Sequence, residues 1–232
     1  MLRPGAGALR SRLPFHLLVS TTESATGLIL RTRPLTETSL IVHWLTPESG
    51  RLATVAKGAR RHKSPFQGKL DIFYQADFSF ARSRRSELHT LREVRLQATR
   101  EPIRKDMQRL QQAAYATALV EDATETDTPL PEIFELLRDF LDHLCQSEPA
   151  PSLIAALELK ILREAGLQPP WSETNLPPGT QKAATTLMEG DWTTGNRLKL
   201  TPAQTGELHG FLQGFIRFHL GRLPRGRAAA WA

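Results

Sequence analysis

The apolar residues of this chain change their spacing once, near Pro102, and that change divides the chain into two regions. From Ala25 to Leu96 they recur with a period of two, which is typical of half-buried strands. Beyond Pro102 they recur with the spacing of one helix face. The first such stripe comprises Ile103, Met107, Leu110, Ala114 and Ala118. The sequence therefore predicts a β-rich domain over 25–100 and an all-helical domain over 101–232.

Five strand-like segments fill the first region. Between the second and the third, Thr46-Pro47-Glu48-Ser49-Gly50 predicts a hairpin turn with a left-handed glycine. Five antiparallel strands in so short a stretch favour a closed barrel, because closure removes exposed edges. The predicted strands are 27–33, 38–46, 51–56, 70–81 and 87–98.

The second region contains three further helical patterns. Ile133, Leu137, Phe140 and Leu144 mark one inward face. Ser152 is a candidate N-cap for the next helix, whose inward residues are Leu153, Leu157 and Ile161 and whose stop signal is Gly166. A loop rich in proline is expected over 168–180, and Thr201-Pro202 opens a last helix that ends at Leu220. The fold class predicted is α+β, a five-stranded barrel followed by helices.

The first 24 residues have a different composition from the rest. They carry Arg3, Arg10 and Arg12 before any acid and only a short apolar patch, so we expect a disordered extension over 1–24, with a targeting peptide as the alternative. Cys145 is the only cysteine, which fits a reducing cytoplasm. No apolar run reaches the roughly 18–20 residues that a membrane helix needs, so a membrane role is not expected.

Positive charge is concentrated in the first region. The net charge is +6, with roughly +11 in residues 1–105 and about −5 in the remainder. The densest stretch, Val55–Ser64, holds four cations and no acid. Unpaired charges are too costly to bury, so this stretch is predicted to be an exposed basic loop. It could bind a phosphate backbone or merely keep the protein soluble.

Cations at neighbouring strand ends favour the first alternative, because a solvated surface usually intersperses them with acids. Phe66 is expected to be an exposed aromatic for base stacking, with Phe73 second and Trp44 and Tyr74 as further candidates. The alternation favours the core for Tyr74, Phe78 and Phe80. The candidate nucleic-acid contacts are Arg31, Arg33, Arg51, Lys57, Arg60, Arg61, Lys63, Phe66, Lys69, Arg82, Arg84, Arg85 and Arg92.

Chemistry-bearing motifs are weak. The sequence has no HExxH, CxxC, GxxxxGK[ST] or G-x-S-x-G pattern, and the acids of the first region are scattered singly. We therefore predict no enzyme activity, no cofactor and no metal site. In the helical region an apolar slot rimmed by Arg104, Lys105, Arg109 or Arg138 could take an acidic-aromatic peptide, although ordinary core packing explains the same pattern.

Three segments resemble the RecO family of bacterial recombination mediators. They are Gly27–Arg33 with Glu37–Val42, then Leu45–Leu52 with Val55–Ser64, and finally Glu87–Leu91 with Ile103–Asp106. The resemblance implies an OB-fold followed by a helical domain. It also implies a non-enzymatic DNA repair protein that binds single- and double-stranded DNA and anneals complementary strands. The implied partners are RecR and the acidic C-terminal tail of single-strand-binding protein, the implied outcome is RecA loading, and the implied place is the cytoplasm, on the nucleoid.

The chain departs from the family pattern in one place. Many members carry a cysteine-based zinc site between the third helix and the last, but residues 166–201 contain no cysteine, so we expect that site to be lost. Two other functions remain open. One is an RNA-binding or ribosome-associated OB-fold module without a role in DNA repair, and the more remote one is a metal-dependent nuclease.

Overall fold

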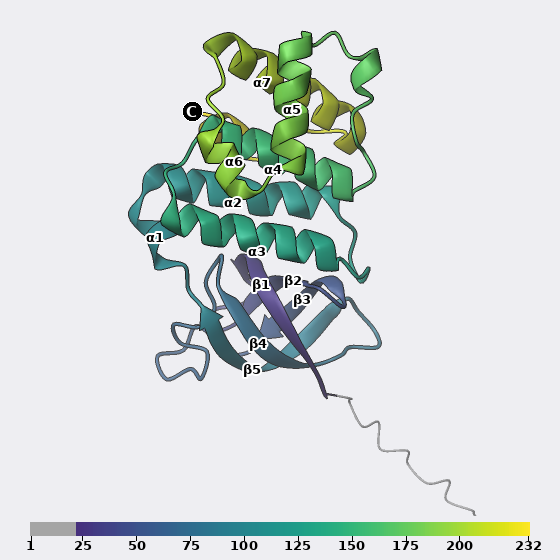
Figure 1. The fold of residues 1–232 in the computed structure, drawn as a ribbon. Coiled ribbons are helices and arrows are strands. Elements are labelled where there is room, and N and C mark those ends of the chain that lie inside the picture. The colour runs from purple at the N-terminus through teal and green to yellow at the C-terminus, as the bar shows by residue number, and fades with distance from the viewer. Residues whose placement is uncertain (1–21) are drawn as a thin grey trace, which may run out of the picture.

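The computed structural model describes residues 22–232 as a β-barrel with a stack of helices on one side of it (Figure 1). The expected disordered extension was placed too far along the chain, because Thr22–Ser24 already pair in the first strand. Residues 1–21 of that extension lie outside the described residues. The strands are β1 (Thr22–Pro34), β2 (Leu40–Thr46), β3 (Gly50–Ala56), β4 (Gln75–Ala81) and β5 (Leu88–Ala98).

The five strands close into a barrel in the order β1-β2-β3-β5-β4, which confirms the predicted OB-fold. The long β1 closes it, since its first half pairs with β4 and its second half with β2. One expectation was wrong: β5 runs parallel to β3, with Ala53 opposite Leu88, so the sheet is not wholly antiparallel. The predicted turn glycine is confirmed, because Gly50 has a φ of +60°.

Aromatic side chains fill the barrel. Trp44 stacks on Phe78 with ring centroids 4.0 Å apart, and its indole N–H donates to Thr54 Oγ1 at 2.9 Å. Phe78 and Phe80 are buried, as expected from their alternation, while Tyr74 is only half-buried. The residues before Gln75 form a turn instead of the predicted strand start, and Phe73 in that turn has a φ of +68°.

The helical domain begins directly after β5. The face predicted from Ile103 to Ala118 was wrong, because Asp106 interrupts the helix and caps a new one, which leaves Met107 69% exposed. The second face, with Leu137 and Phe140, is confirmed. The helices are α1 (Glu101–Lys105), α2 (Met107–Ala123), α3 (Pro131–Gln146), α4 (Pro151–Glu164), η1 (Trp171–Glu173), α5 (Pro178–Glu189), α6 (Trp192–Arg197), α7 (Pro202–Leu220) and α8 (Arg227–Ala230).

The region from 166 to 201 is more ordered than its prolines suggested. Ser152 does not cap α4, because Pro151 is already its first residue and Ala150 its N-cap. Helices α5 and α6, which were not predicted, pack onto α4 through residues such as Leu187. The buried Lys160 donates to the carbonyls of Met188 and Gly190 and so fixes the end of α5. Apolar packing and a buried lysine hold this region.

A buried carboxylate ties the C-terminal segment to the helical core. Glu158 on α4 has no exposed surface, and its oxygens accept hydrogen bonds from Tyr115, Arg227 and Trp231 at 2.6–3.0 Å. A fully buried charge is tolerated only when it is paired and hydrogen-bonded in this way. The segment after α7 is therefore fixed against α2 and α4.

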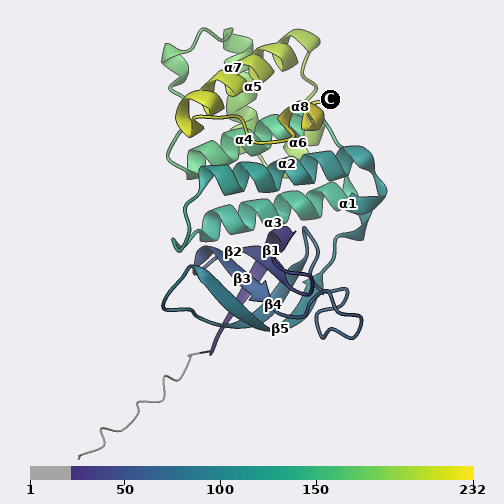
Figure 2. The same ribbon diagram turned by 180° about the vertical axis from the view of Figure 1, so that it is seen from behind.

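The barrel and the helical domain share a packed junction, with α3 lying against the barrel in both views (Figures 1 and 2). Leu28, Leu45 and Phe73 of the barrel belong to the apolar core of the helical domain. The connection between α2 and α3 also bonds to the barrel backbone, because Leu130 N–H donates to Pro47 O at 3.0 Å.

Candidate nucleic-acid interface

The basic loop connects β3 to β4 and is ordered by its own hydrogen bonds. Successive turns include Arg61 N–H to Gly58 O and Ser64 N–H to Arg61 O, each 3.1 Å, and Gly58 has a positive φ of +71°. Arg60 fastens the loop to the β1–β2 turn, because its backbone N–H donates to Thr38 O at 3.0 Å and its guanidinium to Thr36 O at 3.1 Å. The loop therefore has a defined conformation and a fixed position beside the β1–β2 turn.

The ion pairs of the described residues leave out the cations of this loop and Lys69, which follows it. Among residues 22–232, none of Lys57, Arg60, Arg61, Lys63 and Lys69 forms an ion pair. Unneutralised cations held close together create a positive potential that attracts a phosphate backbone.

A cavity of about 380 Å³ opens beside these cations. Arg60, Arg61 and His62 line one part of it, and the half-buried Tyr74 lines another. Arg104 covers part of the Tyr74 ring, with its guanidinium carbon 4.6 Å from the ring centroid. Phe66 also lines the cavity but is only 6% exposed, so the half-buried Tyr74 is the better placed of these two rings to contact a base.

The prediction that Phe66 is exposed was wrong. Its side chain is only 6% exposed and packs in the barrel core, where it anchors the basic loop from below. Phe73 is 1% exposed and Trp44 is fully buried, so neither offers a face to a base. A surrounding run of cations shows that a segment is exposed, but it does not show which way one aromatic side chain within it turns.

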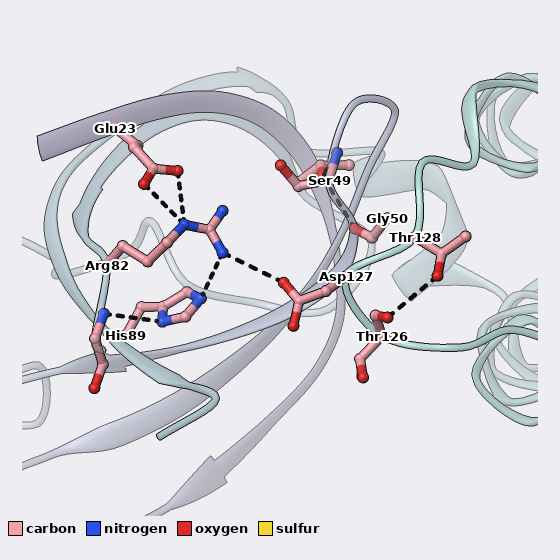
Figure 3. Close-up of polar contacts among 10 residues, drawn as sticks. Glu23, Ser49, Gly50, Arg82, His89, Thr126, Asp127 and Thr128 are labelled. Atoms are coloured by element: carbon pink, nitrogen blue, oxygen red, sulfur yellow. Dashed lines mark hydrogen bonds and ion pairs between the residues drawn. The ribbon is translucent and has the colours of Figure 1, made fainter. Parts of the chain in front are cut away.

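Three of the predicted contacts instead lie at the junction with the helices. Arg82 donates to both oxygens of Glu23 at 2.8 and 2.9 Å and contacts Asp127, in the α2–α3 connection, at 3.4 Å (Figure 3). Arg51 donates to Thr124 O, and Arg31 pairs with Glu121 at 3.4 Å. These arginines join the two domains, and Arg51 and Arg82 have little freedom to reach a ligand.

The four remaining candidate contacts lie in the β4–β5 turn and on two strands. Arg84 and Arg85 are in the β4–β5 turn, across the barrel from the basic loop, as the topology requires and as both ribbon views show. Arg33 and Arg92 are exposed on strands. None of these four is in an ion pair within the described part of the chain. The candidate nucleic-acid contacts are thus divided among the basic loop, the junction, the β4–β5 turn and two strands.

Burial and the positive charges near the junction both change the pKa of His43 on β2. Burial, followed by the positive charges of Arg31, Arg33 and Arg51, lowers the pKa of His43 to about 4. Burial also lowers the pKa of Arg51. His43 Nε2 and Arg51 Nε have no hydrogen-bond partner among the described residues, and both side chains line a small cavity of about 160 Å³.

The four arginines and lysines expected to rim a peptide slot are each paired within the chain. Arg104 contacts Asp71, Lys105 contacts Glu101, and Arg109 contacts Glu148. Arg138 contacts both Glu135 and Asp139. The slot stays a prediction, but a peptide would have to compete with these acids.

Residues 22–232 contain no group of three or more His, Cys, Asp or Glu side chains arranged to hold a metal ion. No helix in this range is both long and apolar enough to cross a membrane.

Family models describe most of this structure. Residues 21–100 match "Recombination protein O N terminal", and residues 104–175 match "Recombination protein O C terminal". The two matches follow the barrel and the first helices in the same order as the structure. The chain belongs to the RecO family. The expected membership is thereby confirmed, and so is the fold that RecO resemblance implied.

The chain is also similar in sequence to individual members of the RecO family. A DNA repair protein RecO from Anaeromyxobacter sp. (strain K) is 34% identical over 144 residues, which is 62% of this chain and 57% of the relative. That from Bacillus pumilus is 33% identical over 143 residues, 62% of this chain and 55% of the relative. That from Myxococcus xanthus is 29% identical over 224 residues, 84% of this chain and 91% of the relative. The chain thus spans little more than half the length of the first two.

Proposed function

We propose that this chain is a DNA-binding recombination mediator without catalytic chemistry. The observation that carries the proposal is the basic loop, whose four cations, together with the following Lys69, are held on an ordered backbone and are left unpaired by the described residues. Contacts from cations to phosphates are independent of base sequence. Binding of single- and double-stranded DNA with little sequence preference follows from such a surface.

Strand annealing follows from the same charges. Two complementary strands repel each other, and a cationic protein surface that neutralises both lowers that barrier without nucleotide or metal. Family membership supports the rest of the proposal, since relatives carry the name DNA repair protein. In that role the chain would act on the nucleoid in the cytoplasm, with RecR and the tail of single-strand-binding protein as partners, and would help RecA replace that protein.

Charge reversal in the loop tests the proposal. Arg60→Glu, Arg61→Glu and Lys63→Glu together should weaken binding of single-stranded DNA at least tenfold and flatten the slope of log K against log salt by about 2, at about 0.7 per lost phosphate contact. The matched control is Lys182→Glu, Arg197→Glu and Lys199→Glu, which makes the same charge change at exposed positions of the helical domain. Equal affinity of the loop variant and the control would refute the loop assignment.

Competition between DNA and RNA tests the alternative module. Single strands of equal length and sequence differ in the 2′-hydroxyl, which an RNA-binding site would recognise. We expect RNA to compete no better than DNA. A strong RNA preference without annealing of DNA would favour the RNA-binding or ribosome-associated function.

A further inference from the structure

A cleft of about 520 Å³ lies between the barrel and the helical domain. The half-buried Ile72 and Leu223 give it apolar surface, and the exposed Ala114 of α2 forms part of its wall. The turn at residues 71–74 separates it from the cavity of the basic loop. Asp71 and Tyr74 line the loop cavity, whereas Ile72 and Phe73 line the cleft, because the left-handed Phe73 reverses the chain there. The cleft and the cavity of the basic loop therefore lie next to each other, on either side of this turn.

Three arginines from two domains meet at this cleft. Arg31 comes from β1, while Arg222 and Arg225 come from the segment after α7. Arg31 contacts Glu121 at 3.4 Å, and Arg222 contacts Asp122 at 2.5 Å. Both carboxylates are mostly covered, at 17% and 16% exposed, whereas the arginines are 52% and 75% exposed. Arg225 is exposed and forms no ion pair with any described residue.

This arrangement leaves most arginine donors facing the solvent. A guanidinium carries five N–H donors, and its planar fork matches a phosphate group better than a lysine does. The acids beneath hold Arg31 and Arg222 in place and use only part of those donors. Three arginines against two carboxylates also leave the cleft with a net positive charge.

The backbone presents these arginines in fixed positions. The β1–β2 register shifts between Ile29 and Arg31, and such a bulge re-aims the following side chain. On the other side, Gly221 and Gly226 both adopt left-handed φ angles, of +74° and +85°, and bracket the segment. Within it Pro224 is buried, and the next residue after Gly226 is the buried Arg227 of the Glu158 cluster. A site mounted on rigid elements costs little ordering entropy when it binds.

We propose that this cleft is a second nucleic-acid site, in which Arg31, Arg222 and Arg225 hold the phosphates of a single strand. The proposal rests on the proposed function and deepens it. One strand occupies the basic loop and the other occupies the cleft, on opposite sides of the 71–74 turn. This places two strands side by side, as annealing requires.

Binding stoichiometry tests the second site. Oligo-dT of about ten nucleotides, within the range that one OB-fold covers, should bind to the full chain at two per protein. Arg222→Gln with Arg225→Gln should reduce this to one, and Ala114→Glu, which adds a charge at an exposed wall without removing an ion pair, should do the same. Arg197→Gln with Lys199→Gln, exposed on the helical domain, should keep two.

The outcomes distinguish this inference from the proposed function. The loop triple variant should also fall from two bound oligonucleotides to one, and the combined loop and cleft variant should bind none. One oligonucleotide on the unaltered chain and none on the loop variant would overturn the cleft and keep the loop. No binding by the unaltered chain would overturn both. A peptide rich in Asp and Glu that binds the unaltered chain but not the cleft variants, with oligo-dT stoichiometry unchanged, would make the cleft a peptide site and overturn the inference.

Discussion

Phe66 connects the basic loop to the barrel core. The side chain is 6% exposed and packs among the aromatic residues inside the barrel, while the residues around it carry the unpaired cations. The loop therefore owes its fixed shape to one buried ring as well as to its turns. The proposed binding of DNA by the loop therefore depends on a residue that also stabilises the barrel.

Phe66→Ala should lower the free energy of unfolding by about 3 kcal/mol, since removal of a buried phenylalanine leaves a cavity. Urea unfolding followed by circular dichroism measures it. Phe218→Ala is the control, because Phe218 is 82% exposed and its loss should change stability by under about 0.5 kcal/mol. Similar small effects of both changes would show that Phe66 does not anchor the loop.

The lowered pKa of His43 predicts that the folded chain loses stability in acid. Its pKa is about 4 in the folded chain, below the usual 6.5, so the unfolded chain binds more protons between these values. The contribution of neutral His43 to the free energy of unfolding is fully present above pH 6.5 and is lost as the pH falls toward 4. Since His43 is only half-buried, we expect a loss of about 1–2 kcal/mol. His43→Asn should show that much less destabilisation between pH 7 and pH 4.5, and parallel pH profiles of the two proteins would contradict the shift.

For single residues, the sequence predicted the exposure of charged side chains better than the direction in which a given side chain points. Exposed positions for the cations of the basic loop follow from the cost of burying charge, and the structure agrees. The inward turn of Phe66 and the pairing of Arg82 with Glu23 and Asp127 depend on contacts between distant segments. Local spacing carries no signal for either.

The β2–β3 turn and the α2–α3 connection fit together at the junction. Gly50 has a φ of +60°, and a Cβ built there would lie 1.8 Å from Thr128 O. The neighbouring contacts between Arg82 and Asp127 appear in the same view (Figure 3). The position of the helices on the barrel thus depends on a glycine for two separate reasons.

Gly50→Ala should cost markedly more stability than Gly68→Ala. Gly68 also has a positive φ, of +72°, but nothing lies within 4 Å of a Cβ built there. The conformational strain, about 1–2 kcal/mol, is common to both, so the difference in urea midpoint reports the close approach to Thr128. Equal midpoints would mean that the junction can open at no cost.

Elements were predictable where their apolar pattern is long. The strands and the helix that contains Leu137 and Phe140 follow their periodicity. Helix α5 was missed, although Ala183, Ala184, Leu187 and Met188 already have helical spacing. Pro177 and Pro178, which stand just before the helix and at its first residue, concealed it. The parallel pairing of β3 with β5 is set by barrel closure, which no single segment encodes.

In the whole molecule, the cations of the basic half lie in several different places. Arg51 and Arg82 join the domains, the basic loop faces outward, and Arg31 meets Arg222 and Arg225 at the cleft. The acidic composition of the helical half concealed its two arginines at this cleft. The proposed DNA-binding surface therefore extends over both domains.

The measurement that tests this account most directly is the annealing rate of complementary single strands, with and without single-strand-binding protein. The unaltered chain should accelerate annealing without nucleotide or metal in both conditions. The loop triple charge reversal should slow it at least tenfold, while the matched Lys182, Arg197 and Lys199 reversal leaves it within about twofold, because phosphate neutralisation depends on the position of the cations. Unaccelerated annealing by the unaltered chain, or equal rates for the loop variant and its control, would contradict the account.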